Sequence, residues 1–287
     1  MKNNLLREIE SKMTSFSKGQ KLIANYINDN YDKAAYMTAA KLGSVVNVSE
    51  STVVRFAIEL GFDGYPDLQH ALQELVRTSL TSVQRMEVTN SRIGDGDVLT
   101  SVLLSDADKI RHTLDAIDKD DFDKAVEKII GAKTIYIMGM RSSATLAGFL
   151  NHNLRMIFDN IKLVDTTSVS EMFEEVMGMG ADDVLVAISF PRYSKRIINA
   201  VDYAKHVGTN VIAITDSKMS PIAQNANEKL IAKSDMVSFV DSLVAPLSIV
   251  NAIVVAVARK KQDELTVRLR KLEEIWDEYD VYDKAHN

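Results

Sequence analysis

The side chains with the clearest chemical signature lie between residues 49 and 55, where hydroxyls and one arginine recur at helical spacing. Ser49, Ser51, Thr52 and Arg55 would share the outer, amino-terminal side of one helix. Hydroxyls and a guanidinium bind phosphate oxygens, and an arginine can donate two hydrogen bonds to guanine. We therefore expect these four residues to contact DNA in its major groove.

Three lysines are candidates for further contacts to DNA phosphates: Lys18, Lys21 and Lys41. Each is also explained as ordinary solvated surface. Glu50 repels phosphate, so its expected role is to stabilise the amino end of the helix through the helix dipole. An ordinary helical hairpin shows a similar pattern, and DNA binding is favoured because the cap, the short turn and the exposed hydroxyls occur together.

A helix-turn-helix would present these residues, and residues 38–62 have its pattern. Thr38 suits the cap of a first short helix, and Asn47 suits a left-handed turn. Ser49 would cap a second helix over 50–60, which the following glycine ends. The predicted inward apolar positions are Ala39, Ala40, Leu42 and Val45 in the first helix and Val53, Phe56, Ala57 and Leu60 in the second.

A second group of polar residues follows predicted strands further along the chain. It consists of Gly139, Arg141, Ser142 and Ser143 after one strand and of Ser189, Arg192 and Ser194 after another. Residues 215–217 and 220 repeat the pattern after a third strand. Backbone amides and hydroxyls at helix amino ends bind anions, and arginine adds a bidentate partner for phosphate or carboxylate. These loops predict an anion site; the alternative is that the serines only cap helices.

The strands that would position these loops are short aliphatic runs at 134–139, 184–189 and 211–215, with weaker candidates at 161–165 and 229–232. Such runs are typical of strands buried on both faces, and their alternation with helical segments predicts a parallel sheet. The fold expected for residues 98–260 is therefore α/β, with a parallel five-stranded sheet flanked by helices. Ligands of such sheets bind at the carboxyl ends of the strands.

The rest of the chain is organised around these two groups. Residues 1–82 are expected to form an all-α helix-turn-helix domain, and the polar, glycine-containing residues 83–97 an interdomain linker. After the α/β domain of residues 98–260, residues 261–287 are expected to form an amphipathic helix and tail, which pack on the chain itself or on a partner subunit. The apolar run at 243–258 predicts a helix buried at a subunit interface.

Composition excludes several classes of protein. The 287 residues are 46% hydrophobic and 26% charged, as in soluble globular chains, and no apolar run is long enough to span a membrane. The chain has no cysteine and only five scattered histidines, so neither a disulfide nor a metal site is expected. A cytoplasmic protein without a cofactor is the expectation.

Charge bears on how the chain would bind DNA. The whole chain has a net charge of −6, and residues 1–82 hold nine basic and nine acidic residues. A neutral monomer binds DNA weakly, because affinity depends largely on neutralising phosphates. We therefore expect a homodimer or homotetramer, in which two recognition helices read the half-sites of a palindromic operator.

Residues 38–65 and the loops after the strands resemble an RpiR-type transcriptional regulator, in which a helix-turn-helix domain is fused to a sugar isomerase (SIS) domain. The resemblance covers nearly the whole chain. It implies binding of operator DNA at carbohydrate metabolism genes and sensing of a phosphorylated sugar or sugar acid. The family's first loop, Gly-x-Gly-x-Ser, is matched by Gly139 and Ser143, and its phosphate loop, Ser-x-Ser-Gly-x-Ser/Thr, by Ser189 and Ser194.

The chain departs from that pattern at two points. Arg141 stands where the first loop usually has its second glycine, and Pro-Arg at 191–192 replaces the Ser-Gly of the second loop. We interpret the two arginines as partners for an anion of higher charge than a hexose phosphate, such as a phosphorylated sugar acid. The alternative is that they pair with the local carboxylates Asp165, Glu171 or Asp216.

A phosphosugar isomerase with an accessory helical domain is the alternative function, because related SIS domains move a proton with a glutamate or histidine. The candidate residues are His152, Glu171, Glu174 and Glu175. His152 is more simply explained as a core or interface residue, and no clear pair of acid and base is present. A regulator that is not an enzyme is favoured, since a ligand that changes the placement of two recognition helices suffices to change DNA affinity.

Overall fold

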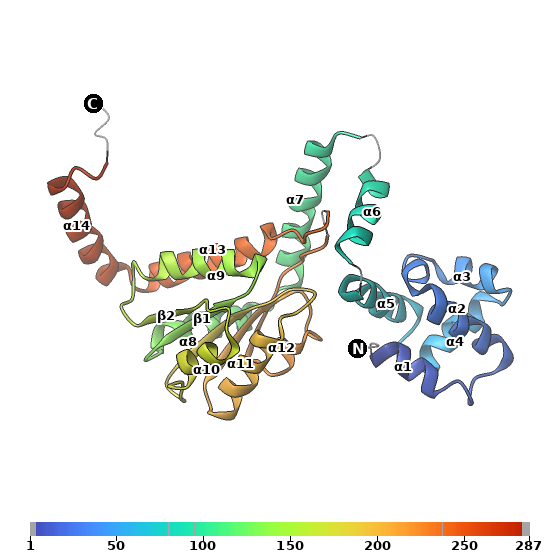
Figure 1. Ribbon diagram of the computed structural model, residues 1–287. Coiled ribbons are helices and arrows are strands. Elements are labelled where there is room, and N and C mark those ends of the chain that lie inside the picture. Colours follow the sequence, from blue (N-terminus) through green and yellow to red (C-terminus); the bar gives the residue numbers. More distant parts are fainter. Residues whose placement is uncertain (1–3, 80, 94–95, 237, 283–287) are drawn as a thin grey trace. The chain divides into compact units, whose positions relative to one another are not determined.

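The computed structural model describes residues 4–79, 81–93, 96–236 and 238–282 (Figure 1). The chain forms two compact units that divide between Arg85 and Met86. The first unit is helical, and the second contains a five-stranded parallel sheet with helices on both faces. Both parts of the predicted fold class are confirmed.

The first unit contains α1 (Asn4–Ser11), α2 (Lys18–Ala34), α3 (Ala39–Val46), α4 (Glu50–Glu59) and α5 (Tyr65–Ser79). Its fully buried side chains include Ile23, Ile27, Leu42, Val53, Phe56, Leu68 and Leu72. All four inward positions predicted for the second helix of the helix-turn-helix are buried. In the first helix the prediction is wrong for Ala40 and Val45, which are exposed because the short α3 buries only one narrow face.

Side chains of α5 fix the connection between α2 and α3. The buried Tyr65 donates its hydroxyl hydrogen bond to the carbonyl oxygen of Met37 at 2.8 Å. Gln69 donates to the same oxygen at 2.7 Å, and Gln73 donates to the carbonyl oxygen of Ala35 at 3.0 Å. Burial raises the pKa of Tyr65 to about 12. These contacts hold the segment that leads into the helix-turn-helix.

Helix α6 (Ser82–Ile93) crosses the division between the two units. It occupies most of the segment 83–97 that the sequence suggested as a linker, so that segment is largely helical. Residues 94–95 lie outside the described residues. The α/β part then opens with two helices, α7 (Val98–Ala116) and α8 (Lys119–Gly131).

The sheet consists of β1 (Ile135–Gly139), β2 (Ile161–Val164), β3 (Val184–Ile188), β4 (Asn210–Thr215) and β5 (Glu228–Ile231). All neighbouring strands are parallel, and their order is β2-β1-β3-β4-β5. Each strand begins and ends within one residue of its predicted run. The central strands β1, β3 and β4 were predictable because a strand covered on both faces is apolar along nearly its whole length. The edge strands β2 and β5 each contain a lysine, which is why their signal in the sequence is weaker.

Helices α8, α9 (Ser142–Leu154) and α13 (Val244–Lys260) pack on one face of the sheet (Figure 1). Helices α10 (Val169–Val176), α11 (Lys195–His206) and α12 (Pro221–Gln224) pack on the other. Strand residues alternate between the two cores, as β1 shows: Ile135 and Ile137 join the first core, and Tyr136 and Met138 the second. None of the described helices is long and apolar enough to cross a membrane.

The last two helices leave apolar surface uncovered. Helix α13 buries Ile249 and Ile253 in the core, whereas Val255 on its other side is exposed. Helix α14 (Gln262–Glu278) extends from the end of α13 and has no buried residue (Figure 1). Its Arg268 donates to Asp159 at 2.6 Å. The apolar character of residues 243–258 is thus explained in part by the chain's own core.

We expect Tyr65→Phe to destabilise the first unit by about 1 kcal/mol, the usual contribution of one buried hydrogen bond. The loss should shrink above pH 10, where the phenol ionises in the unfolded chain, whereas the buried phenol has a pKa of about 12. The free energy of unfolding in urea, measured near pH 7 and above pH 10, tests both statements. The control is Tyr31→Phe in the same unit, whose hydroxyl makes no hydrogen bond with the described residues; equal losses in the two variants would contradict the role of Tyr65.

Candidate functional site

The helix-turn-helix forms as predicted. Thr38 caps α3 by accepting from the backbone N–H of Lys41 at 3.2 Å, and Asn47 has left-handed backbone with φ 59° and ψ 45°. Ser49 caps α4 by accepting from the backbone N–H of Thr52 at 3.3 Å. A three-residue turn therefore separates the two helices and directs the amino end of α4 outward.

The four predicted DNA contacts lie together at this end of α4. Ser49, Ser51 and Arg55 are exposed, and Thr52 is partly exposed. The Ser49 hydroxyl oxygen lies 2.9 Å from that of Ser51 and 2.8 Å from that of Thr52. Nε of Arg55 donates to the carbonyl oxygen of Ser51 at 3.2 Å, while its two terminal nitrogens have no partner among the described residues. The guanidinium is thus steadied by its own helix and keeps the fork that binds phosphate or guanine.

A cleft beside these residues includes the start of α2. It is lined by Ser17, Gly19, Gln20, Thr52 and Arg55. Ser17 and Gln20 form a reciprocal capping box, in which the Ser17 backbone donates to Oε1 of Gln20 at 2.9 Å. A Cβ at Gly19 would lie only 3.2 Å from Cγ2 of Thr52, so glycine permits the close approach of α2 to α4. Ser17, Gly19 and Gln20 are not among the residues predicted from the sequence, although Ser-x-x-Gln is a recognisable capping pattern.

The candidate phosphate contacts are all at the surface. Lys18 and Lys21 lie in the first turn of α2, Lys41 lies in the first turn of α3, and all three are exposed. Glu50 is also exposed in the first turn of α4, where its negative charge interacts favourably with the positive end of the helix dipole. The surface therefore combines hydroxyls, lysines and one arginine around helix amino ends.

The second group of predicted residues lies where the strand order of the sheet reverses, between β1 and β3. Strand β1 pairs with β2 on one side and with β3 on the other. The helix after β1 covers one face of the sheet and the helix after β3 covers the other. Ligands of open α/β sheets bind in the crevice at such a point. Residues 139–143 and 189–194 follow these two neighbouring strands, so the structure brings the two loops to the same edge.

Within these loops the hydroxyl groups differ in burial. Ser143 and Ser189 are buried, Ser194 is partly buried, and Ser142 is exposed. Gly139 is tightly constrained, because a Cβ there would lie 2.3 Å from the carbonyl oxygen of Ser143. The first loop can therefore only form with glycine at this position.

The two arginines have backbone conformations that favour glycine. Arg141 has φ 58° and ψ −126°, and Arg192 has φ 60°. Both are exposed, and the Arg141 side chain makes no hydrogen bond or ion pair with the described residues. Pairing of Arg141 with Asp165, Glu171 or Asp216 is therefore not observed. Each of these two positions therefore combines a backbone conformation that favours glycine with a guanidinium group.

Helices α9 and α11, which begin at these loops, have no side-chain cap. Arg141 and Ser194 occupy the cap positions, and neither side chain bonds to the first turn. The caps of α10 and α12, Ser168 and Ser220, do accept from their helices. In α9 the N–H groups of Ser143 and Ala144 donate to the carbonyl oxygens of Met140 and Arg141, so only the first N–H, that of Ser142, is left for water or an anion. In the described structure the first turn of α11, residues 195–197, has no such backbone bonds and is open to water or an anion.

The loop after β4 has a structural role. The Tyr193 hydroxyl donates to Oδ1 of Asp216 at 2.9 Å, and the Thr215 hydroxyl donates to the same oxygen at 3.2 Å. The hydroxyls of Ser217 and Ser220 accept from nearby backbone N–H groups. In this loop the serines are explained as caps, and Asp216 holds the neighbouring loop through Tyr193.

The residues considered for isomerase chemistry do not form one cluster, because His152 lies on α9 and the three glutamates lie on α10, on the opposite face of the sheet. His152 lies in the last turn of α9, at the opposite end of the helix from the loop, and it is exposed rather than in the core. Glu171 accepts a hydrogen bond from Thr166, and Glu174 and Glu175 are exposed. Desolvation, together with the carboxylates of Asp165 and Glu171, raises the pKa of Glu175. Among the described residues no group of His, Asp and Glu is arranged to hold a metal ion.

Two family models match separate parts of the chain. The helix-turn-helix domain of the rpiR family matches residues 3–79, and the SIS domain matches residues 128–256. The chain belongs to the RpiR family. Each model coincides with one of the two surfaces described above, since the first contains α2 to α4 and the second contains the loops after β1, β3 and β4.

Individual relatives match across most of the chain. The HTH-type transcriptional regulator HexR of Escherichia coli is 28% identical over 226 residues, which cover 78% of this chain and 75% of HexR. The structure of Vibrio vulnificus NanR complexed with ManNAc-6P has a TM-score of 0.60 at 24% identity and covers 96% of this chain and 99% of NanR. The sugar isomerase domain of an RpiR transcription factor from Sphaerobacter thermophilus has a TM-score of 0.58 at 24% identity and covers 61% of this chain and 97% of that domain. The fold of this RpiR-family chain is thus shared with solved structures.

Backbone strain at Arg141 is testable by substitution. Arg141→Gly should be more stable than Arg141→Ala by about 1–2 kcal/mol, because glycine relieves the strain of this backbone conformation and loses only part of that gain to its more flexible unfolded state. Calorimetric unfolding of the two variants gives the comparison, and both lack the same guanidinium. Equal stability would mean that the loop relaxes to another conformation.

Proposed function

We propose that this RpiR-family chain regulates genes of carbohydrate metabolism by binding operator DNA through α4 and an anionic, sugar-derived effector through the loops after β1 and β3. The observation that carries the effector site is the pair of uncapped helices, α9 and α11, which begin at neighbouring loops that each contain an arginine and buried serine. An anion would accept from the N–H groups of the first turn of α11 and from the Arg141 guanidinium, with Arg192 in the neighbouring loop as a further source of positive charge.

The two arginines indicate the class of effector. NanR, which shares the fold, was solved with the sugar phosphate ManNAc-6P. A phosphate alone can accept hydrogen bonds from a helix amino end and the loop hydroxyls. Arg141 and Arg192 add two positive charges where the family usually has glycine, so we propose a second anionic group on the effector, as in a phosphorylated sugar acid.

Operator binding is proposed to require two copies of the chain. Residues 1–82 have no excess of positive charge, so a single copy has little electrostatic affinity for DNA. A homodimer or homotetramer places two copies of α4 on the half-sites of a palindromic operator. We propose that the protein acts in the cytoplasm, where DNA and metabolites are both accessible.

We propose that the chain is not an enzyme. His152 lies at the far end of α9 from the loops, and Glu171 is engaged with Thr166. A sensor needs only different affinities for its effector in two arrangements of the subunits. Conversion of any aldose phosphate to its ketose by the purified chain, absent from an Arg192→Ala preparation, would reverse this assignment.

DNA recognition is tested at Arg55. Operator sequences are first selected from random oligonucleotides, and Arg55→Ala should then bind the selected sequence about 5- to 150-fold more weakly, as expected for loss of one base contact. The melting temperature should stay unchanged, because the side chain is exposed. Arg7→Ala removes an exposed arginine from α1 and is the matched control. If the two variants bind alike, Arg55 does not read DNA.

Effector binding is tested by thermal shift with phosphorylated sugars and phosphorylated sugar acids. A ligand at a hundredfold excess over its Kd adds about 2.7 kcal/mol of stability. Arg192→Ala should reduce that shift most for the sugar acids, because they carry the additional charge. Arg155→Ala, at the exposed carboxyl end of α9, is the matched control. Undiminished shifts in Arg192→Ala would remove this arginine from the site.

A further inference from the structure

Helix α7 presents a stripe of apolar side chains that nothing in the described chain covers. Leu99, Leu103, Ile110 and Leu114 are 68%, 59%, 38% and 65% exposed, and Ala107 lies between them. At 100° per residue these five positions fall within about 80° of the helix circumference. A contiguous exposed apolar surface of this kind usually marks an interaction site.

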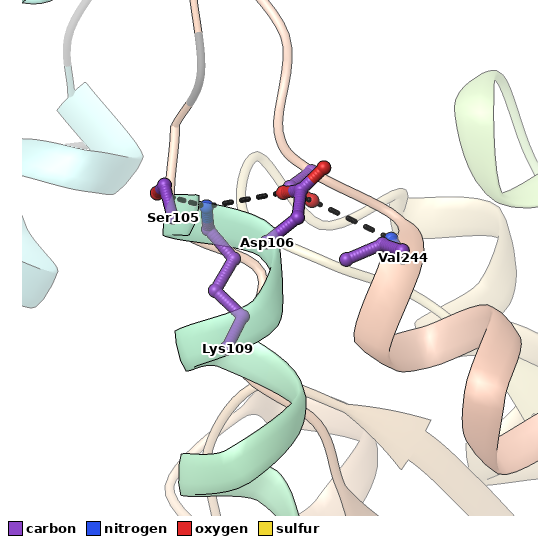
Figure 2. Close-up of polar contacts among 5 residues, drawn as sticks. Ser105, Asp106, Lys109 and Val244 are labelled. Carbon is purple, nitrogen blue, oxygen red and sulfur yellow. Dashed lines mark hydrogen bonds and ion pairs between the residues drawn. The ribbon is translucent and has the colours of Figure 1, made fainter. Parts of the chain in front are cut away.

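The orientation of this stripe is fixed by contacts on the adjacent side of α7. The buried Lys109 donates to the Ser105 hydroxyl at 2.7 Å and lies 3.3 Å from Oδ1 of Asp106 (Figure 2). Ser242 donates to the same carboxylate oxygen at 2.7 Å and accepts from the backbone N–H of Val244, at the start of α13. These bonds hold α7 against the α/β unit with the stripe facing outward.

The spacing of the stripe is symmetric, and this symmetry identifies the occupant. In an antiparallel pair of identical helices centred between residues 106 and 107, Leu99 faces Leu114 of the other copy and Leu103 faces Ile110. A two-fold interface requires this reciprocity, in which each residue meets its partner twice. We propose that α7 packs antiparallel against α7 of a second copy of the chain.

Charge at the centre of this contact is balanced. The stripe contains no charged residue, and at its edge Asp106 would lie near Asp106 of the second copy. Lys109 and Ser242 both bind this carboxylate, so its charge is offset where the two copies meet. The stripe extends for about 22 Å along the helix, which allows several layers of side chains to interdigitate.

The proposal deepens the two-copy operator binding proposed above by naming the surface that joins the copies. Because the chain has no cysteine, introduced cysteines report this contact without background. The double variant Leu103→Cys with Ile110→Cys should form a covalent dimer under mild oxidation. The cysteine at 103 of each copy would face the cysteine at 110 of the other copy across the two-fold axis. Neither single variant should form a covalent dimer, because the two copies of residue 103, or of residue 110, are separated by about 10 Å along the helix axis.

The matched control is Ser101→Cys with Asp108→Cys, which has the same spacing on the opposite, exposed side of α7. Cross-linking of both double variants, or of the single variants, would overturn the antiparallel arrangement. The mass of the uncrosslinked full chain separates the two proposals. A dimeric mass without cross-linking at 103 and 110 refutes the α7 contact and leaves two-copy operator binding intact. A monomeric mass in the presence of operator DNA refutes both.

Leu103→Asp gives a second measurement. It should shift the full chain from dimer to monomer at the same concentration, with an unchanged circular dichroism spectrum before melting because Leu103 is exposed in the single chain. Ser101→Asp adds the same charge to the opposite side and should remain dimeric. An unchanged dissociation constant of the dimer in Leu103→Asp would exclude the stripe from the interface.

Discussion

Left-handed backbone just before a helix is the constraint on which both surfaces depend. Asn47, Arg141 and Arg192 have φ values of 59°, 58° and 60°, and each lies within three residues of the start of a helix. Such a residue turns the chain sharply, and a helix begins within the next three residues. In α4 this end carries hydroxyls and Arg55, and in α9 and α11 it is left without a side-chain cap. The same local geometry thus lies beneath both the proposed DNA-contacting surface and the proposed anion site.

Arginine at two of these positions is energetically unfavourable for the fold alone. A side chain at such backbone angles costs about 1–3 kcal/mol, which glycine avoids. Gly139 shows that the first loop has no room to adapt, because the Ser143 backbone lies directly against it. Hydrogen bonds to charged groups contribute about 1.5–3 kcal/mol each, so a bidentate contact with an anion can offset the strain. The anion contact proposed for Arg141 would therefore be large enough to offset the strain of its backbone.

Local patterns made much of this structure predictable from the sequence. The cap at Ser49, the turn at Asn47 and the ends of the strands depend on a few neighbouring residues, and all were predicted. Features that depend on distant residues were not. The cleft beside Thr52 depends on how closely Gly19 lets α2 approach α4. The exposure of Val45 depends on which side of α3 packs against the core. Periodicity gives the apolar face of a helix but not how much of it is covered.

Hydrogen bonds connect the proposed effector loops to α7 within the second unit. Tyr193 in the loop after β3 binds Asp216, and the carbonyl oxygen of the adjoining Thr215 accepts from the backbone of Ala232 at 2.7 Å. The next residue, Lys233, donates its N–H to the Thr113 hydroxyl of α7 at 2.9 Å. An anion that binds more tightly to one arrangement of Tyr193 would bias the segment after β5, and with it the position of α7. Because α7 carries the proposed contact between copies, we propose this series of hydrogen bonds as a route by which the effector alters operator binding.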